Sequence, residues 1–217
     1  MRLVLFDVDG TLIDSQAHIV ASMDAAFASL DLTPPSRRET LSIVGLSLPQ
    51  AMAVLAPEGP VARLVSAYKE AYQTLRASHG EADVSPLFPG IRTVLDALHA
   101  EPETLLGVAT GKSRRGLDHV MEAHDLGGYF VTRQDADGHP SKPHPSMALA
   151  ALAESGAEQG TVIGDTTFDM EMARAAGRGA LGVGWGYHDA QRLAAVADLV
   201  VSDVEELLPA LTKPTSG

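Results

Sequence analysis

The chain has 217 residues, of which 45% are hydrophobic, so it can build one ordinary domain or a core with a modest insertion. Its 28 acidic and 16 basic residues give a net charge of -12, which disfavours nonspecific binding to nucleic acid or anionic membranes. Because the sequence contains no cysteine, it can form neither a disulfide framework nor a thiolate nucleophile or zinc-thiolate site.

Five short apolar runs are predicted strands, and segments with helical patterning lie between them. Near-continuous apolar strands that alternate with helices favour a parallel sheet covered on both faces. Ligands of such sheets bind at the carboxyl ends of the strands, where Asp7, Thr110 and Asp165 fall. The predicted strands are RLVLF (2–6), LLGVAT (105–110), YFVT (129–132), TVIG (161–164) and ALGVG (180–184).

Roughly 100 residues separate the first two predicted strands, far more than a single crossover helix needs. We expect one helix after a possible cap at Ser15 and another beginning near Pro49, with VGLS (44–47) as a loop before it. Two apolar stripes have helical spacing and are interpreted as packing surfaces. They contain Ile19, Met23, Phe27 and Leu30, and Val61, Leu64, Val65, Tyr68, Tyr72 and Leu75. The sequence thus predicts a helical cap domain over residues 15–85, inserted into a core of residues 1–14 and 86–217.

The motif DVDGT (7–11) places two carboxylates directly after a buried strand, where uncompensated negative charge is costly. Gly10 allows a sharp turn out of the sheet. An EF-hand calcium loop needs glycine at its sixth position, whereas here the glycine is fourth. By itself the motif is compatible with a plain turn that carries aspartates.

The motif ATGKS (109–113) ends the second strand and opens a helix. Free backbone N–H groups at a helix start, together with the Thr110 hydroxyl, suit phosphate oxygens. A P-loop requires four residues between its glycines, but only three separate Gly107 from Gly111. An ordinary strand-to-helix turn is an equally good interpretation of this motif alone.

Two later motifs add a lysine and two acids. Lys142 lies in PSKPHPS (140–146), too rich in proline for the middle of a helix. In GDTTFD (164–169), N-capping of the next helix would explain Asp165 but not the two acids at the neighbouring strand. Strand-end acids with a lysine and a hydroxyl-bearing turn predict a divalent cation site beside a nucleophile, and hard oxygen ligands favour Mg²⁺.

These four motifs, in this order and over essentially the whole chain, resemble the signatures of the haloacid dehalogenase superfamily. The resemblance is to its phosphatases of the phosphoglycolate phosphatase type, which have a helical cap. It implies an α/β fold with a Rossmann-like parallel sheet core. It also implies that Asp7 is the nucleophile that forms an aspartyl-phosphate and that Asp9 is the general acid and then the base. Asp165 would complete the Mg²⁺ site with Asp7 and the Asp9 backbone carbonyl, supported by Asp169.

The same resemblance assigns the phosphoryl group and the leaving group to different parts of the chain. Thr110 and Lys142 would hold the phosphoryl group, with Gly111 beside them in the pocket. The cap would close over the site and exclude water, so Val44, Gly45, Leu46 and Ser47 are candidates for contacting the leaving group.

The leading hypothesis is a Mg²⁺-dependent phosphatase of a small phosphorylated metabolite, with phosphoglycolate as the first guess. A dehalogenase is disfavoured because halide leaves without the proton that Asp9 would supply. The alternatives are a phosphosugar mutase, a nucleotide or pyrophosphate phosphohydrolase, a P-loop-like nucleotide-binding module and a non-catalytic protein of the same fold. His18 is offset by one residue from the position of the mutase cap histidine, which favours hydrolysis.

No apolar stretch approaches the roughly 18 residues that span a bilayer, and the lack of cysteine is compatible with a reducing compartment. We therefore expect a cytoplasmic monomer or homodimer that binds a small phosphorylated metabolite and neither nucleic acid nor membrane.

Overall fold

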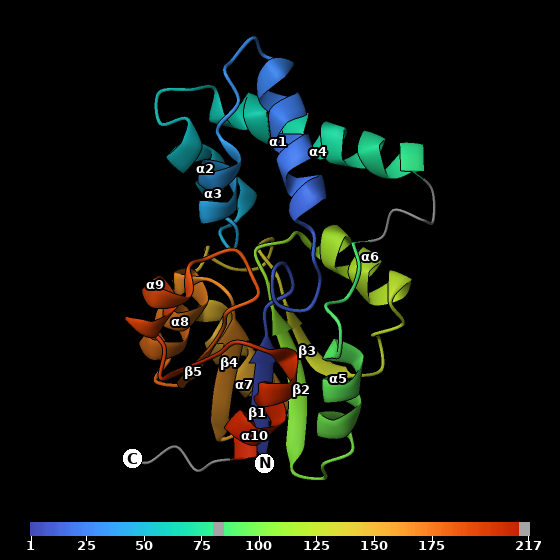
Figure 1. Cartoon of the computed structure of the whole chain (residues 1–217), viewed down its shortest axis with the longest axis vertical. Helices are drawn as coiled ribbons and strands as arrows, with labels where there is room; N and C mark the ends of the chain where they lie inside the picture. The colour runs from blue at the N-terminus through green and yellow to red at the C-terminus, as the bar shows by residue number, and fades with distance from the viewer. Residues whose placement is uncertain (80–84, 213–217) are drawn as a thin grey trace.

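A computed structural model describes residues 1–79 and 85–212. Its sheet has six parallel strands in the order β3-β2-β1-β4-β5-β6, with β1 at the centre (Figure 1). The strands are β1 (Arg2–Phe6), β2 (Thr104–Ala109), β3 (Phe130–Gln134), β4 (Gln159–Gly164), β5 (Gly179–Val183) and β6 (Leu199–Val201).

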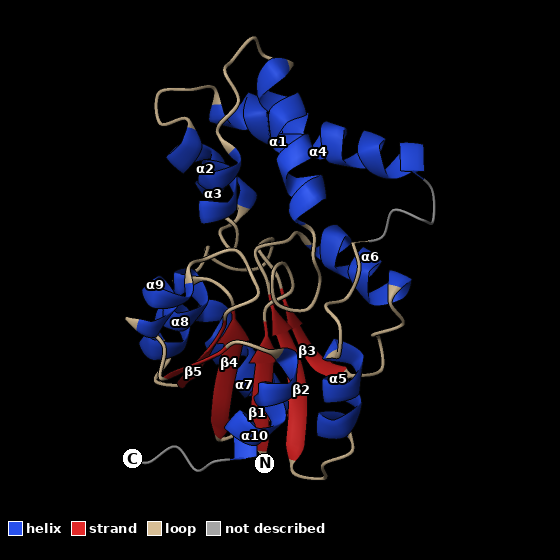
Figure 2. Cartoon of the chain, in the orientation of Figure 1, coloured by secondary structure: helices blue, strands red, loops and turns tan. Residues whose placement is uncertain are grey.

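Both faces of the sheet are buried beneath helices, as the apolar strands predict. Successive side chains of β1 point to opposite faces, so Val4 and Phe6 enter one hydrophobic cluster while Leu3 and Leu5 enter the other. The parallel α/β core is therefore confirmed (Figure 2). Helices α5 (Ile91–His99), α6 (Arg114–Ala123) and α10 (Leu207–Thr212) cover the first face, and α7 (Ser146–Ser155), α8 (Thr167–Ala175) and α9 (Ala190–Ala194) cover the second.

The sixth strand, β6, is absent from the sequence-based expectation. It has only three residues and is followed at once by a 3-10 helix, η2 (Val204–Glu206), so its period-2 pattern is too short to detect. Its pairing with β5 places it at the sheet edge, far from β1 in the strand order.

The described part of the chain places five helices between β1 and β2. We refer to the first four of them and their connecting loops, residues 16–79, as the cap. Figure 1 shows the cap beyond the carboxyl ends of the strands. Helix α1 packs along α4, and the interior of the cap contains Met23, Phe27, Met52 and Leu64. The helices are α1 (Gln16–Ala28), α2 (Arg37–Ser42), α3 (Leu48–Leu55) and α4 (Val61–His79).

The helix starts agree only in part with the expectation. Helix α3 follows Ser47 and has proline in its first turn, as predicted. Ser15 occupies the N-cap position of α1, but its side chain makes no capping hydrogen bond, so the predicted helix cap is wrong in its chemistry. Helix α2, which was not expected, begins with a capping box between Ser36 and Glu39.

The loop at residues 44–47 packs against the core. A Cβ on Gly111 would lie 2.5 Å from the carbonyl oxygen of Leu46, so only glycine permits this approach. The Ser47 N–H donates to the Ser141 hydroxyl at 2.8 Å. The cap loop thus touches the segments that carry two of the core motifs.

A buried histidine forms a second bridge between the cap and the core. His188 accepts a hydrogen bond from the Thr167 N–H on Nδ1 and reaches the Ser42 carbonyl with Nε2, each at 3.1 Å. Burial lowers the pKa of His188, so the neutral ring with a proton on Nε2 satisfies both contacts.

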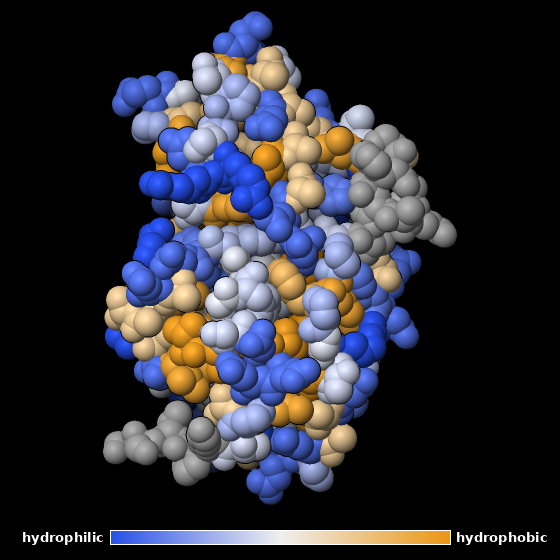
Figure 3. Space-filling view, in the orientation of Figure 1, coloured by the Kyte–Doolittle hydropathy of each residue, from blue (hydrophilic) through white to orange (hydrophobic). Residues whose placement is uncertain are grey.

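No helix within residues 1–79 and 85–212 combines the length and apolar character needed to cross a bilayer. On the face drawn in Figure 3, hydrophilic residues are spread over both the cap and the core.

Candidate active site

The first motif forms a tight turn after β1 that packs against Asp165 at the end of β4. Asp7 is 1% exposed, and its N–H still donates to the Ile163 carbonyl, so its position is fixed by the sheet. Gly10 has φ +81°, and a Cβ there would lie 2.2 Å from Asp165 Oδ2. The Thr11 hydroxyl donates to Asp165 Oδ1 at 2.9 Å. Glycine is therefore needed both for the turn and for the close approach of Asp165.

Three of the predicted acids converge at the carboxyl ends of β1 and β4. Asp7, Asp165 and Asp169 each offer a carboxylate oxygen within 4.8 Å of the others, and all three are buried. The side chain of Asp9 is not part of this cluster. The sequence-based assignment of Asp9 to the metal site through its backbone carbonyl stays a prediction.

Lys142 supplies one positive charge to this cluster. Its Nζ lies 2.9 Å from Asp7 Oδ1 and 2.6 Å from Asp169 Oδ1, and its side chain is completely buried. Burial alone would lower the pKa of Lys142, but Asp169 and Asp7 outweigh burial and hold this pKa above its usual value. The proline-rich loop that carries Lys142 thus delivers a permanent cation to the strand ends.

One lysine does not compensate three carboxylates. Asp7 Oδ2 is buried, and no donor in the described part of the chain forms a hydrogen bond with it. Burial raises the pKa of Asp7 to about 7, with Asp169 and Asp9 adding to the effect and Lys142 opposing it. Burial likewise raises the pKa of Asp165, reinforced by Asp7 and Asp169. A clustered set of hard carboxylate oxygens with an unsatisfied member fits a divalent cation such as Mg²⁺.

Asp165 is not the N-cap of α8, the helix after β4, although its position in the sequence allowed that alternative. The N-cap residue is Thr166, whose hydroxyl accepts from the Asp169 N–H. Asp169 Oδ2 completes a capping box by accepting from the Thr166 N–H, while its Oδ1 accepts from Lys142. Asp165 is free of capping and instead accepts from Thr11 and from the Tyr187 N–H.

The second motif lies beside these acids at the end of β2. Thr110 is fully buried, its hydroxyl accepts from the Lys112 N–H at 3.2 Å, and both it and Gly111 line the cavity described below. Gly107 lies inside β2, so residues 107–113 do not form one glycine-rich loop of the P-loop kind. Lys112 Nζ is directed to Asp9, with 2.9 Å to Oδ1.

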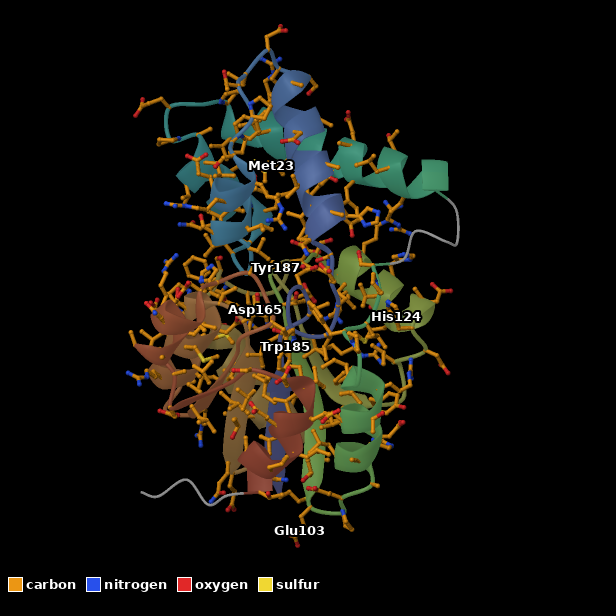
Figure 4. The ribbon with its side chains drawn as sticks, in the orientation of Figure 1. Met23, Glu103, His124, Asp165, Trp185 and Tyr187 are labelled. Atoms are coloured by element: carbon orange, nitrogen blue, oxygen red, sulfur yellow. The ribbon has the colours of Figure 1, made fainter. Side chains whose placement is uncertain are left out.

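A chain of hydrogen bonds that sequence analysis missed holds Asp9. The Ser15 hydroxyl donates to Asp9 Oδ1, the atom that also contacts Lys112. The Tyr187 hydroxyl accepts from the Ser15 N–H at 2.9 Å and lies 3.1 Å from Ser15 Oγ. Because the Ser15 proton is used on Asp9, Tyr187 must be the donor in this second contact. Figure 4 shows Tyr187 close to Asp165, just below the cap.

The first and second motifs open into a cavity of about 500 Å³ between the cap and the core. Its core wall includes Asp7, Asp9, Thr110 and Lys112. The cap wall includes all four residues expected to contact the leaving group, namely Val44, Gly45, Leu46 and Ser47. Tyr68 and Tyr72 of α4 also line it, with ring centroids 6.2 Å apart, so part of the stripe interpreted as packing faces the site.

Comparisons with known proteins agree with this geometry. The family model described as "Haloacid dehalogenase-like hydrolase" matches residues 4–183. The "Probable phosphatase IndB" of Dickeya dadantii is 35% identical over 206 residues, covering 93% of this chain and 89% of the relative. The phosphoglycolate phosphatase of Pseudomonas fluorescens is 30% identical over 221 residues, covering 96% and 79%.

A solved structure extends the likeness to three dimensions. The crystal structure of a hydrolase from Pseudomonas syringae has a TM-score of 0.85 and 26% identity and covers all of both chains. The sheet order, the buried acids at the strand ends and the family match are thus consistent with one another. The chain therefore belongs to the haloacid dehalogenase-like hydrolases, and its activity is that of a phosphatase of this family.

Proposed function

We propose that this phosphatase hydrolyses a small phosphomonoester of the phosphoglycolate kind, with Mg²⁺ and through an aspartyl-phosphate on Asp7. The observation that carries the proposal is the state of Asp7. Its Oδ2 is buried and lacks a hydrogen-bond donor in the described residues, while its Oδ1 is paired with Lys142. A carboxylate held in this way at the floor of a cavity has a free oxygen for a metal or for nucleophilic attack.

The proposal includes the predicted division of the chain into a core domain of residues 1–14 and 86–217 and an inserted domain of residues 15–85 that contains the cap. The sheet and its motifs would perform the chemistry, and the cap would contact the leaving group. Contacts of the 44–47 loop with Gly111 and Ser141 support this division of roles, since they close the cavity above the acids.

Asp7, Asp165 and the Asp9 backbone carbonyl would hold Mg²⁺, with Asp169 as support. When bound, the ion would offset the negative charge of the phosphoryl oxygens as the nucleophile approaches. Asp169 would contribute through Lys142, which it holds at 2.6 Å. Asp165 is kept in place by two donors, the Thr11 hydroxyl and the Tyr187 N–H.

In the first step, Lys142 and the Thr110 hydroxyl hold the phosphoryl oxygens while an Asp7 oxygen attacks phosphorus. The new Asp7–phosphorus bond forms as the ester P–O bond breaks, and Asp9 gives its proton to the departing oxygen. In the second step, Asp9 takes a proton from the water that attacks the aspartyl-phosphate. This releases inorganic phosphate and restores Asp7 as a carboxylate.

A phosphoglycolate-like substrate is supported by the curated relatives named phosphoglycolate phosphatase. Hydrolysis is favoured over mutase chemistry because His18 is absent from the described residues that line the cavity. Its ring instead lies 6.0 Å from that of Tyr72, and its Nδ1 lies 3.3 Å from the Ser85 hydroxyl. This position lies at the joint between the cap and the core.

A phosphate-release screen with and without Mg²⁺ tests the proposal. The panel would contain phosphoglycolate, sugar phosphates, nucleotides and pyrophosphate, with Asp7→Asn as the inactive control. We expect Mg²⁺-dependent release from phosphoglycolate and trapping of a covalent phosphoenzyme in acid-quenched wild type only. Release that does not depend on Mg²⁺, or an Asp7→Asn variant with wild-type turnover, would contradict it.

A further inference from the structure

Lys112 is a largely buried cation that the proposed mechanism does not use. Its side chain is 11% exposed, and its Nζ lies 2.9 Å from Asp9 Oδ1 and 5.7 Å from the ring centroid of Tyr72. Burial alone would lower the pKa of Lys112, but Asp9 and the two neighbouring tyrosines, Tyr72 and Tyr68, outweigh burial and raise it. The side chain is therefore an ammonium at the wall of the cavity.

Contacts of both the backbone and the side-chain end of Lys112 determine where its ammonium lies. The Lys112 N–H donates to the Thr110 hydroxyl, and its carbonyl accepts from the Ala136 N–H at 2.9 Å. At the other end, Asp9 and the face of Tyr72 hold the charged group. Thus one short loop carries Thr110, proposed to bind the phosphoryl group, and a cation directed toward the leaving-group side.

The distance to Asp9 indicates what this cation would bind. A proton donor must lie about 3 Å from the departing ester oxygen, so that oxygen is a near neighbour of Lys112 as well. In an ester whose oxygen-bearing carbon also carries a carboxylate, ordinary bond lengths place a carboxylate oxygen roughly 3 Å from the ester oxygen. Such a carboxylate would lie within reach of Lys112 Nζ.

Charge compensation points to the same ligand. Asp9 Oδ1 is the carboxylate oxygen that the described residues bring to Lys112 Nζ, and it also accepts from the Ser15 hydroxyl. An ammonium has three N–H donors, and leaving donors unsatisfied in a largely enclosed place is costly, so a substrate that supplies an anion there is favoured over a neutral one. The chain has a net charge of -12, so a buried ammonium beside the leaving group is a specific means of attracting an anion.

We infer that Lys112 is a specificity-determining residue that binds a carboxylate next to the ester oxygen, and that the substrates are phosphate esters of 2-hydroxycarboxylic acids. The inference rests on the proposed function and deepens it. In this inference, the lysine of the second motif recognises the leaving group. In a P-loop protein that lysine would instead bind nucleotide phosphates.

A comparison of two esters and three proteins tests this role. Phosphoglycolate and ethylene glycol monophosphate have the same length, but only the first has a carboxylate. The proteins are wild type, Lys112→Met and Arg114→Met. Arg114 is a matched control because it is the next cation along the chain, at the start of α6, pairs with Asp135 and does not belong to the cavity lining.

Wild type should prefer phosphoglycolate. Lys112→Met should reduce kcat/KM for phosphoglycolate about tenfold to hundredfold more than for the neutral ester, the usual effect of a hydrogen bond to a charged group. Arg114→Met should leave the ratio of the two esters unchanged. Inhibition gives a readout without turnover. Lys112→Met should weaken the binding of the inhibitor 3-phosphonopropionate by a similar factor and leave the binding of its neutral analogue 3-hydroxypropylphosphonate unchanged.

The possible failures are distinguishable. If Lys112→Met slows both esters equally and both inhibitors keep their relative affinities, Lys112 serves only Asp9, and the inference is wrong while the phosphatase proposal stands. If folded wild type hydrolyses neither ester but acts on other phosphomonoesters with Mg²⁺, the substrate class is wrong. If no ester is hydrolysed with Mg²⁺, the proposed function fails together with the inference.

Discussion

Asp7→Asn should change how the stability of the metal-free protein depends on pH. The pKa of the Asp7 carboxyl is raised from its ordinary value of 3.8 to about 7, chiefly by burial. Between these two values the unfolded chain has released the proton while the folded protein retains it. Raising the pH over this window therefore favours unfolding, and the effect levels off above the folded pKa. An asparagine has no such proton to lose.

The size of the effect follows from the two pKa values. They differ by roughly three pH units, and each unit corresponds to about 1.4 kcal/mol, so wild type should lose up to about 4 kcal/mol relative to Asp7→Asn. For a protein of this length, that corresponds to a relative change in Tm of about 8 to 16 °C between pH 4 and pH 8. The Tm of Asp7→Asn should thus rise relative to that of wild type as the pH rises.

The assay is thermal unfolding with a chelator present, at half-unit steps from pH 4 to pH 8.5. Asp24→Asn, which removes an exposed aspartate of α1, controls for the loss of one negative charge. Adding Mg²⁺ at pH 8 should then raise the Tm of wild type more than that of Asp7→Asn, because the ion needs the ionised carboxylate. Parallel Tm curves for wild type and Asp7→Asn would refute the argument from burial.

Four further substitutions test separate parts of the site. Asp9→Asn should slow single-turnover cleavage of an alkyl phosphate about 10²–10⁴-fold but that of a nitrophenyl phosphate much less, whereas equal slowing would exclude a general acid. Asp165→Asn should raise the Mg²⁺ concentration needed for half-maximal activity, measured by metal titration; an unchanged titration would remove it from the metal site. Tyr187→Phe should lower kcat for alkyl esters more than for aryl esters, since it loses the bond to Ser15 that steadies Asp9, and a uniform loss would argue against this. Gly111→Ala should lower kcat/KM on every substrate at nearly unchanged Tm, because its Cβ would collide with the cap loop, and full activity would contradict that contact.

Much of the candidate site could be predicted from the sequence, because the carboxyl ends of parallel strands meet at one edge of a sheet. Once RLVLF and TVIG are recognised as strands, Asp7 and Asp165 are expected at the same edge of the sheet, and the structure shows that β1 and β4 pair directly. The insertion could be inferred from chain length alone. The short strand β6 and helix α2 could not, because elements of three and six residues show too little periodicity.

Other assignments were incomplete because a local pattern has several physical uses. Ser15 has the residue type and position of a helix N-cap, but in the folded chain its hydroxyl donates a hydrogen bond to Asp9 instead of capping the helix. Tyr68 and Tyr72 have helical spacing in either case, and only the docking of α4 above the site decides that they also face a cavity. A stripe of apolar and aromatic residues does not by itself distinguish packing from binding.

The sequence by itself determined the chain order of the five longer strands, the acids and hydroxyl at the strand ends, and the presence of a lysine for charge compensation. These follow from local hydrophobic patterns and from the common edge of a parallel sheet. Only the tertiary structure decided that Lys112 faces Asp9 and that Tyr187 supports Ser15 across 172 positions of sequence. Such contacts depend on how the cap docks and how loops fold over one another, and no local periodicity encodes the distance between two loops.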